Sequence, residues 1–347
     1  MKSGLREYRK SSIPPSPQSP QREKEHHQGD PEISNKKTIL FLVGPTAIGK
    51  TECGIRLAQN INTEIISADS MQVYQEMDIG TSKPTPHERS LVRHHLVDFV
   101  HPSESYSVGR YQKDADAVIR QLHDAGKVPL VVGGTGLYVR VLTHGLFEGP
   151  EADPGLRKRL KDLALNHGPN ALYEKLKQVD TESAKRIHPN DERRLIRAIE
   201  VHEITGKTIS ALQGEQKALR EEQYRIVMIG LTTSRNRLYA KIENRVDKMM
   251  EMGLVNEVEK LLKMGVSEDS VSMQGLGYKE IIAYLKKKTT IEDAVNILKQ
   301  ETRHFAKHQM TWFKAEPRIY WLEISAYPGL DKLHEAVIGL AEKNLEI

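Results

Sequence analysis

The sequence TILFLVGPTAIGKT, residues Thr38–Thr51, joins a buried-strand pattern to a glycine-rich loop. The run Thr38–Val43 is almost continuously apolar, which is typical of a strand buried on both faces of a parallel sheet. The residues after it fit the pattern G-x-x-x-x-G-K-[ST], the P-loop, and a helical pattern follows through Gln59. Because this motif binds phosphate when it lies between a strand and a helix, we expect a phosphate site here.

The composition of the loop explains why phosphate is the expected ligand. Its glycines allow backbone N–H groups to turn inward around phosphate oxygens, and the helix N-terminus adds partial positive charge. The ammonium of Lys50 would neutralise the terminal phosphates, and the hydroxyl of Thr51 would bind Mg²⁺. The predicted phosphate-binding residues are Gly44, Pro45, Thr46, Ala47, Ile48, Gly49, Lys50 and Thr51.

Beyond the loop, strand patterns alternate with helix patterns. Strands are predicted at Thr38–Val43, Glu64–Ser67, Val128–Val132, Arg225–Leu231 and Ile319–Ile324. Helices are predicted through Gln59 and at Val108–Ala125, Arg235–Met252, Val255–Met264, Tyr278–Lys286 and Ile291–Phe313. This order favours an α/β fold, a P-loop NTPase-like doubly wound parallel sheet.

Two segments depart from the alternation. Residues 150–214 lose the buried-strand signal, are rich in charge and helical pattern, and are predicted to form a helical insertion domain. The catalytic core would then consist of residues 38–149 and 215–347. Residues 1–37 contain a Pro/Ser run and a charged stretch with little to bury, so we predict a disordered tail there.

The composition restricts the class of protein further. The chain has 347 residues, and no stretch approaches the roughly 18 apolar residues of a membrane-spanning helix. The single cysteine, Cys53, excludes an intramolecular disulfide framework and fits a reducing compartment, so we expect a cytoplasmic protein without membrane association. Nothing suggests a symmetric interface, and a monomer is expected. The net charge is +4, of which residues 1–37 carry +3, so any nucleic-acid surface must arise from local charge distribution.

Asp69 follows the predicted strand Glu64–Ser67 directly. The carboxyl ends of strands are where open α/β sheets place their ligands, so this carboxylate would face the phosphate loop. It could bind Mg²⁺ or act as a general base, while Ser70 and Gln72 offer hydrogen bonds to a base edge. The alternative is that Asp69 is only a helix N-cap.

The usual nucleotide signatures do not accompany the loop. The strand Val128–Val132 ends in Gly133-Gly134, where a Walker-B carboxylate would be expected. No Asn-Lys-x-Asp motif for guanine follows in the sequence. The loop therefore predicts a polyphosphate ligand without showing that it is a nucleotide.

Several longer segments of the chain are distinctive: GPTAIGKT, IISADSMQVYQEMDIGTSKP (Ile65–Pro84), VVGGTGLYV, RIHPNDERRLIRAIE (Arg186–Glu200), GLGYKE and AKHQMTWF. Together they resemble the tRNA dimethylallyltransferase family, also called the tRNA isopentenyltransferase family. The similarity runs from about Thr38 to the last predicted strand, and Asp69–Pro84 is its most specific part. The resemblance implies transfer of a dimethylallyl group from dimethylallyl diphosphate to N6 of adenosine 37 in tRNAs that read codons starting with U.

The resemblance also implies roles for individual residues. Thr46–Thr51 and Arg235 would bind the diphosphate, with Mg²⁺ on Thr51. Lys50 and Arg235 would stabilise the departing diphosphate, and Asp69 would accept the proton of the adenine amine. The anticodon stem-loop of the tRNA would contact Asp69, Ser70, Met71, Gln72, Thr135, Arg157, Arg193, Arg194, Leu195, Ile196 and Arg197.

One segment departs from the family pattern. Residues Arg303–Gln309 read RHFAKHQ where the family usually carries R-R-Y-A-K-R-Q. Neutral histidines attract phosphate less at pH 7 than arginines do and make the attraction sensitive to pH.

Three other functions remain open from the sequence. An adenylate isopentenyltransferase would perform the same chemistry on free AMP, ADP or ATP, but it needs no long basic surface such as the arginines of the insertion. A small-molecule kinase would use the loop for ATP, and the missing Walker-B carboxylate argues against it. An RNA-binding protein with a degenerate loop would not need Lys50, Thr51 and Asp69 together.

Overall fold

The structure is a computed structural model that describes residues 36–147, 149–168 and 170–346. Residues from Lys36 onward form one compact unit. The predicted tail 1–37 lies outside the described residues except for Lys36 and Lys37, and Lys37 is already the first residue of a strand. None of the helices in the described part of the chain has the length and apolar character that crossing a membrane requires.

The described residues build one six-stranded sheet with the strand order β3-β2-β4-β1-β5-β6. All of its pairings are parallel, which confirms the predicted α/β class and doubly wound sheet. Sequence patterns had not indicated β3, because two residues are too short to show a period. The strands are β1 (Lys37–Val43), β2 (Ile65–Ala68), β3 (His94–His95), β4 (Leu130–Gly133), β5 (Tyr224–Thr232) and β6 (Ile319–Glu323).

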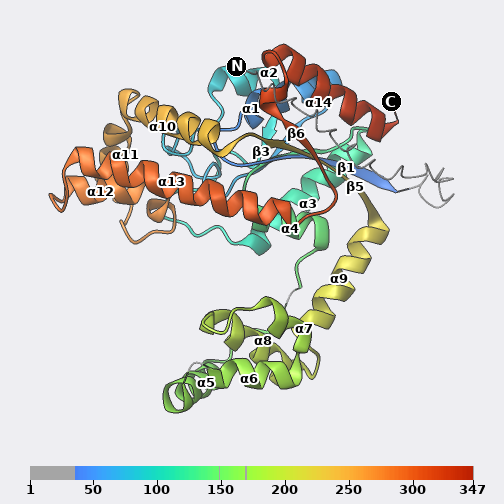
Figure 1. The fold of residues 1–347 in the computed structure, drawn as a ribbon, viewed down its shortest axis with the longest axis vertical. Helices are drawn as coiled ribbons and strands as arrows, with labels where there is room; N and C mark the ends of the chain where they lie inside the picture. The colour runs from blue at the N-terminus through green and yellow to red at the C-terminus, as the bar shows by residue number, and fades with distance from the viewer. Residues whose placement is uncertain (1–35, 148, 169, 347) are drawn as a thin grey trace, which may run out of the picture. The chain divides into compact units, whose positions relative to one another are not determined.

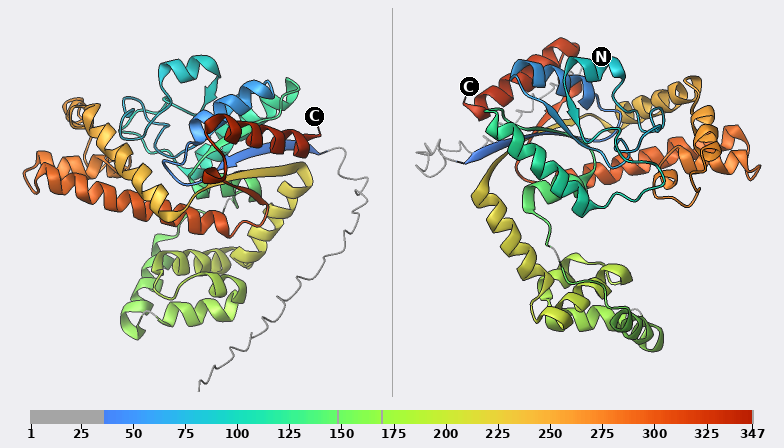
Figure 2. Two further views of the ribbon diagram at one scale, coloured as in Figure 1. Left: turned by 45° about the horizontal axis from the view of Figure 1, so that its top comes forward. Right: turned by 180° about the vertical axis from the view of Figure 1, so that it is seen from behind.

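Helices cover both faces of this sheet (Figure 1, Figure 2). Those outside the insertion are α1 (Lys50–Asn60), α2 (Pro86–Leu91), α3 (Val108–Asp124), α4 (Gly136–His144), α10 (Arg235–Glu251), α11 (Leu254–Lys263), α12 (Tyr278–Leu285), α13 (Ile291–Lys314) and α14 (Leu330–Leu345). Those between α4 and β5 are α5 (Pro154–His167), α6 (Asn170–Val179), α7 (Thr181–Arg186), α8 (Glu192–Thr205) and α9 (Ile209–Gln223).

Strand β1 is the centre of two separate cores. Its residues Ile39, Phe41 and Val43 are fully buried in one core with side chains from α3 and α4. Leu40 and Leu42 point the other way and are buried with side chains from α1 and α14. Because alternate residues serve opposite cores, both faces must be apolar, and this produces the unbroken apolar run in the sequence.

The carboxyl ends of the central strands are level with one another. Val43 of β1 is in register with Gly133 of β4 and Gly230 of β5, and Ala68 of β2 is also in register with Gly133. A Cβ on Gly133 would lie 2.2 Å from the carbonyl oxygen of Ala68, so only glycine fits this close approach. The loops that follow β1, β2, β4 and β5 therefore meet at a single edge of the sheet.

The helical insertion has a hydrophobic core of its own. Leucines 156, 160, 172 and 176 pack there with Leu195, Ile196 and Ile199. The predicted boundary at residue 214 lies inside α9, so the chain has no break at that point. The end of α9 is fixed to the sheet domain, where Arg220 donates to Asp116 at 2.6 Å and to the Leu142 carbonyl at 2.8 Å.

A buried carboxylate organises the start of the insertion. Glu200 of α8 is 0% exposed and accepts hydrogen bonds from Arg157, Arg197 and the backbone N–H of Asp153, at 2.7–2.9 Å. Burial alone would raise the pKa of Glu200, but these bonds outweigh it and lower the pKa to about 2. Arg157 therefore holds α5 to α8, and Arg197, on α8 itself, also donates to the Pro150 carbonyl at 3.0 Å.

Replacing Glu200 by Ala is expected to lower the free energy of unfolding by about 2–4 kcal/mol, because two arginines lose their buried partner. Since the folded pKa lies below the ordinary 4.5, this stabilisation is present above pH 4.5 and is lost as the pH falls towards 2. Urea unfolding of wild type and variant at several pH values measures both effects. The exposed Glu203→Ala should cost less than about 1 kcal/mol; equal losses at pH 7 would contradict the account.

Candidate active site

The P-loop connects β1 to α1 at the level edge of the sheet. Gly44 has φ 149°, and a Cβ there would lie 2.7 Å from the carbonyl oxygen of Leu231. Gly49 has φ 106° and begins α1, so both glycines adopt a conformation that other residues rarely reach. The Lys50 ammonium donates to the Pro45 carbonyl at 2.8 Å, which folds the side chain back over the loop.

A turn after β2 presents Asp69. Its Oδ1 accepts from the backbone N–H of Met71 at 2.9 Å and of Gln72 at 3.3 Å. The hydroxyl of Thr135, after β4, accepts from the N–H of Ser70 at 3.0 Å. Oδ2 of Asp69 has no hydrogen bond to any described residue. The turn is therefore fixed from two strands, while one carboxylate oxygen stays available.

Two cavities open on either side of Asp69. The first has a volume of about 560 Å³ and is lined by the P-loop residues Thr46–Thr51, by Asp69 and Gln72, and by one face of α10. The second has a volume of about 500 Å³ and is lined by Ser70, Met71 and Thr135 together with residues of α12 and α13. Gly44 and Pro45 lie beneath the first cavity without lining it. The residues that line both cavities are Thr46, Asp69, Arg245, Met249 and Phe305.

The wall between the cavities contains a backbone nest around Glu257. This carboxylate, on α11, accepts from the N–H groups of Asp78, Ile79 and Gly80 at 2.7–3.1 Å and from the Tyr278 hydroxyl at 2.7 Å. Ile79 lines the first cavity, whereas Gly80 and Tyr278 line the second. Glu257 thus fixes the segment that separates the two spaces.

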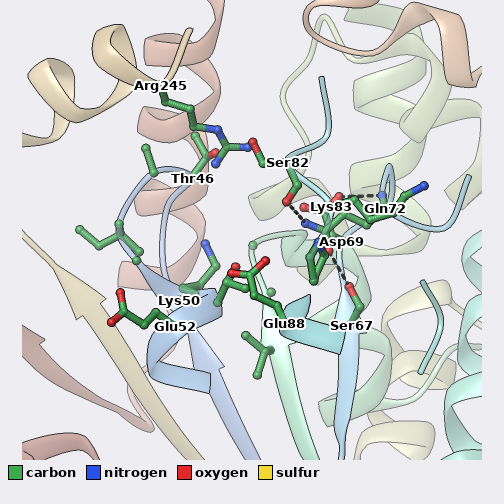
Figure 3. A pocket seen from close by; sticks show the side chains of 18 of the residues that line it. Thr46, Lys50, Glu52, Ser67, Asp69, Gln72, Ser82, Lys83, Glu88 and Arg245 are labelled. Carbon is green, nitrogen blue, oxygen red and sulfur yellow. Dashed lines mark hydrogen bonds between the residues drawn. The ribbon is translucent and has the colours of Figure 1, made fainter. Parts of the chain in front are cut away.

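Two positively charged side chains of the first cavity form no ion pair with any described residue. Lys50 and Arg245 project into the space beside Asp69 (Figure 3). Desolvation lowers the pKa of Lys50 to about 7; Asp69 opposes this shift, and the positive charge of Arg245 adds to it. Desolvation also lowers the pKa of Arg245, again against the effect of Asp69. The neighbouring Lys83 differs, because Asp78 and Asp98 bind its ammonium at 2.6 and 2.8 Å.

The position of the second cation corrects the expectation for Arg235. That residue is exposed at the start of α10, where its Nε donates to the Tyr239 hydroxyl at 3.0 Å, and it lines neither cavity. Arg245 lies ten residues later, which is about 15 Å further along the helix. At this distance along α10, Arg245 lies in the first cavity with Lys50, and Arg235 lies outside it.

Gln309 of α13 joins the P-loop to the turn after β4. Its Oε1 accepts from the N–H of Thr46 and its Nε2 donates to the Gly134 carbonyl, both at 2.8 Å. The residue is 7% exposed, and a Cβ on Gly134 would lie 2.4 Å from Nε2. Sequence reasoning missed Gln309, Arg245 and Glu257, although GLGYKE and AKHQMTWF pointed to their neighbourhood.

The hydroxyl of Thr51 suits a metal ion that is coordinated mainly by water and by the phosphate oxygens of a bound substrate. Thr51 lines the first cavity. Within the described residues, no group of three or more His, Cys, Asp or Glu side chains could hold a metal ion. Mg²⁺ keeps several waters and commonly takes one or two protein oxygens plus phosphate oxygens, so the hydroxyl fits such an ion.

The remaining predicted residues belong to the insertion and line neither cavity. Arg193 and Arg194 are exposed on α8, whereas Arg157 and Arg197 are bound to Glu200. Leu195 and Ile196 are 0% and 5% exposed in the core of the insertion, so the expectation that their side chains contact RNA is corrected.

A further arginine lies near those of the insertion. Arg140 of α4 is exposed, and desolvation together with the positive charges of Arg186 and Arg194 lowers its pKa. Like charges raise the energy of one another, so this cluster favours an anion between the insertion and α4.

Comparison with known proteins gives one consistent result. A family model described as "IPP transferase" matches residues 72–316, and one described as "Isopentenyl transferase" matches residues 37–101. A tRNA dimethylallyltransferase of Carboxydothermus hydrogenoformans is 47% identical over 307 residues, 88% of this chain and 98% of the relative. That of Caldanaerobacter subterraneus subsp. tengcongensis is 46% identical over 301 residues, 86% and 96% of the two chains.

Solved structures agree with these relatives. The full-length tRNA isopentenylpyrophosphate transferase from Bacillus halodurans aligns with a TM-score of 0.66 and 40% identity, over 90% of this chain and 99% of that one. A eukaryotic dimethylallyltransferase acting on tRNA aligns with a TM-score of 0.65 and 29% identity, over 83% and 74%.

Arg245→Ala is expected to weaken the binding of inorganic diphosphate by about 10–100-fold, because a charge-assisted contact in a desolvated site is lost. Arg235→Ala is the matched control on the same helix and should change the affinity by less than about twofold. Titration calorimetry of both variants provides the measurement. A larger loss in Arg235→Ala would restore the expectation drawn from the sequence.

Binding of diphosphate above pH 7 is expected to take up protons. At pH 8 the Lys50 amine is largely neutral, since its pKa is about 7, and a bound anion would restore its charge. The affinity should therefore fall as the pH rises above 7. Calorimetry in two buffers with different ionisation enthalpies measures the uptake, and Lys50→Met should abolish it; equal uptake in both proteins would contradict the assignment.

Proposed function

The chain belongs to the IPP transferase family, and on this premise we propose how its two cavities divide the work of tRNA dimethylallyl transfer. The enzyme is a transferase that moves a dimethylallyl group onto tRNA, as the names of its relatives state. One observation carries the detailed proposal: Asp69 lies where a cavity rich in uncompensated positive charge meets a second cavity.

The first cavity would hold dimethylallyl diphosphate. Gly44 and Gly49 adopt the positive φ values that the loop requires. Lys50 and Arg245 supply positive charge, and Asp69 is the negative charge near both of them. Diphosphate would complete this arrangement and return Lys50 to its charged form. Mg²⁺ on Thr51 would bind diphosphate oxygens and neutralise part of their charge.

The second cavity would receive the adenine of the tRNA. Ser70, Met71 and Thr135 line it, and Asp69 reaches into both spaces. In the transfer, N6 of adenine attacks the C1 carbon of the donor and the C1–O bond to the diphosphate breaks. The diphosphate leaves with that electron pair, while the N6 proton passes to Oδ2 of Asp69. Lys50 and Arg245 stabilise the negative charge that grows on the leaving oxygen.

The RNA would rest on the arginines outside the cavities. Arg193, Arg194 and Arg140 are exposed on the insertion and on α4, where they can contact the phosphates of an anticodon stem-loop. As the acceptor we propose N6 of adenosine 37 in tRNAs that read codons starting with U, which the family resemblance implies. A single-stranded loop gives up an unstacked base at lower cost than a duplex. The cytoplasmic location and the monomeric state stay predictions from the sequence.

Free AMP is the less favoured acceptor. A mononucleotide would fill the second cavity without using the insertion, and the relatives are named for their action on tRNA. The arginine cluster formed by Arg140, Arg186 and Arg194 has no role in that reaction.

Asp69→Asn is expected to lower kcat for transfer to an anticodon stem-loop by about 10²–10⁴-fold, since the amide cannot accept the N6 proton. Its inhibition constant for inorganic diphosphate should stay the same or fall, because one negative charge leaves the anion site. The control is Asp124→Asn, which makes the same change at an exposed carboxylate on α3 and should leave both values unchanged. Equal activity of the two variants would remove Asp69 from the role of base.

A further inference from the structure

Two apolar side chains lie where the cavities meet. Of the five residues that line both cavities, Thr46, Asp69 and Arg245 are polar, and each has a place in the transfer described above. The other two are Met249 of α10 and Phe305 of α13. Their side chains cannot form the polar contacts that the proposed chemistry uses. The transferred carbon must nevertheless pass from the first cavity to the second at the point that they line.

Helix α10 changes character along the face that it turns to the first cavity. Lys241, Arg245 and Lys248 line the cavity first, and Met249 and Met252 follow at the end of the helix. A basic stretch followed by an apolar one matches a ligand with an anionic head and a hydrocarbon tail. The methionine side chain also adapts to irregular apolar shapes.

Phe305 is held at the junction by the packing of its helix. It is 43% exposed, although Ala306 and Gln309 beside it on α13 are buried. Gln309 lies one turn further on and binds both Thr46 of the P-loop and Gly134. The ring therefore has a fixed position relative to the diphosphate site, and an exposed aromatic ring facing a cavity is a surface that a hydrocarbon ligand would cover.

We propose that Met249 and Phe305 form the seat of the transferred five-carbon chain and limit its length. The proposal rests on the proposed function and names the residues that would select the donor. With the diphosphate held by Lys50 and Arg245, a dimethylallyl chain reaches the Met249–Phe305 pair, and C1 lies beside Asp69. A ten-carbon chain would extend past this pair and obstruct the space that the adenine must enter.

Another apolar wall of the first cavity is less suitable. Ile79 and Pro84 line that cavity only, on the segment anchored by Glu257. A chain lying against them would be separated from the second cavity, and from the incoming N6, by the segment 78–80. Ile79→Ala therefore tests the competing location directly.

The experiment compares donors of two lengths. Wild type, Phe305→Ala and Met249→Ala are assayed with dimethylallyl diphosphate and geranyl diphosphate, with an anticodon stem-loop as acceptor. The proposal expects the ratio of kcat/KM for the ten-carbon donor over the five-carbon donor to rise by about tenfold or more in both variants. Inhibition by inorganic diphosphate should change by less than about twofold, because the cations are untouched.

Matched controls separate the seat from general effects on the helices. Ile297→Ala removes an exposed side chain of α13, and Met264→Ala removes an exposed methionine beyond α11; neither lines a cavity. Both should keep the wild-type ratio. Because Met249 is 7% exposed and its truncation can reduce stability, Phe305→Leu supplies a milder variant, for which a smaller shift in the same direction is expected.

A binding measurement distinguishes failure of this inference from failure of the proposed function. Wild type should bind dimethylallyl diphosphate more tightly than inorganic diphosphate, and Phe305→Ala should reduce that preference by about tenfold, with no acceptor present. If wild type transfers nothing to the stem-loop, the proposed function fails, while this preference still tests the seat. An unchanged donor ratio and preference in Phe305→Ala and Met249→Ala, or a shift confined to Ile79→Ala, would overturn the proposal.

Discussion

The side-chain amide of Gln309 connects three segments that are far apart in the sequence. Its oxygen takes the N–H of Thr46 in the P-loop, and its nitrogen donates to Gly134 after β4, while its backbone belongs to α13. Gln309 is buried, and a buried polar group that loses its partner costs about 1–3 kcal/mol. This amide fixes α13, and with it Phe305, relative to the P-loop, in addition to the apolar packing of Leu298 and Phe313.

The same edge of the sheet gathers charges that no described residue neutralises fully. Level strand ends bring the P-loop and Asp69 together, and α10 adds Arg245 from the far side. Desolvation is the main reason that the pKa of Lys50 falls to about 7 before any ligand binds, and the positive charge of Arg245 adds to the shift. An anionic ligand would therefore neutralise the charges of Lys50 and Arg245. In the proposed reaction these charges act on the diphosphate, which is the leaving group.

The sequence predicted those parts of the site that local patterns encode. The strand before the P-loop, the glycines of the loop and the position of Asp69 after β2 all follow from short segments, and the parallel sheet follows from their order. Arg235 was expected at the diphosphate from the family resemblance, and the structure places it outside both cavities. Which faces of α10 and α13 meet the cavities depends on tertiary packing, and so Arg245, Met249 and Phe305 could not be identified from local patterns. Leu195 and Ile196 lie in one motif with Arg193 and Arg194, which are exposed, but helical periodicity turns the two apolar side chains inward.

The central claim is that the two substrates reach Asp69 from different cavities. A crystal structure with an unreactive thio-analogue of dimethylallyl diphosphate and an anticodon stem-loop tests it most directly. The account predicts diphosphate oxygens within hydrogen-bond distance of Lys50 and Arg245, and adenine N6 within the same distance of Asp69 from the side of Thr135. A diphosphate bound away from the P-loop, or an adenine that enters the cavity of Lys50, would contradict it.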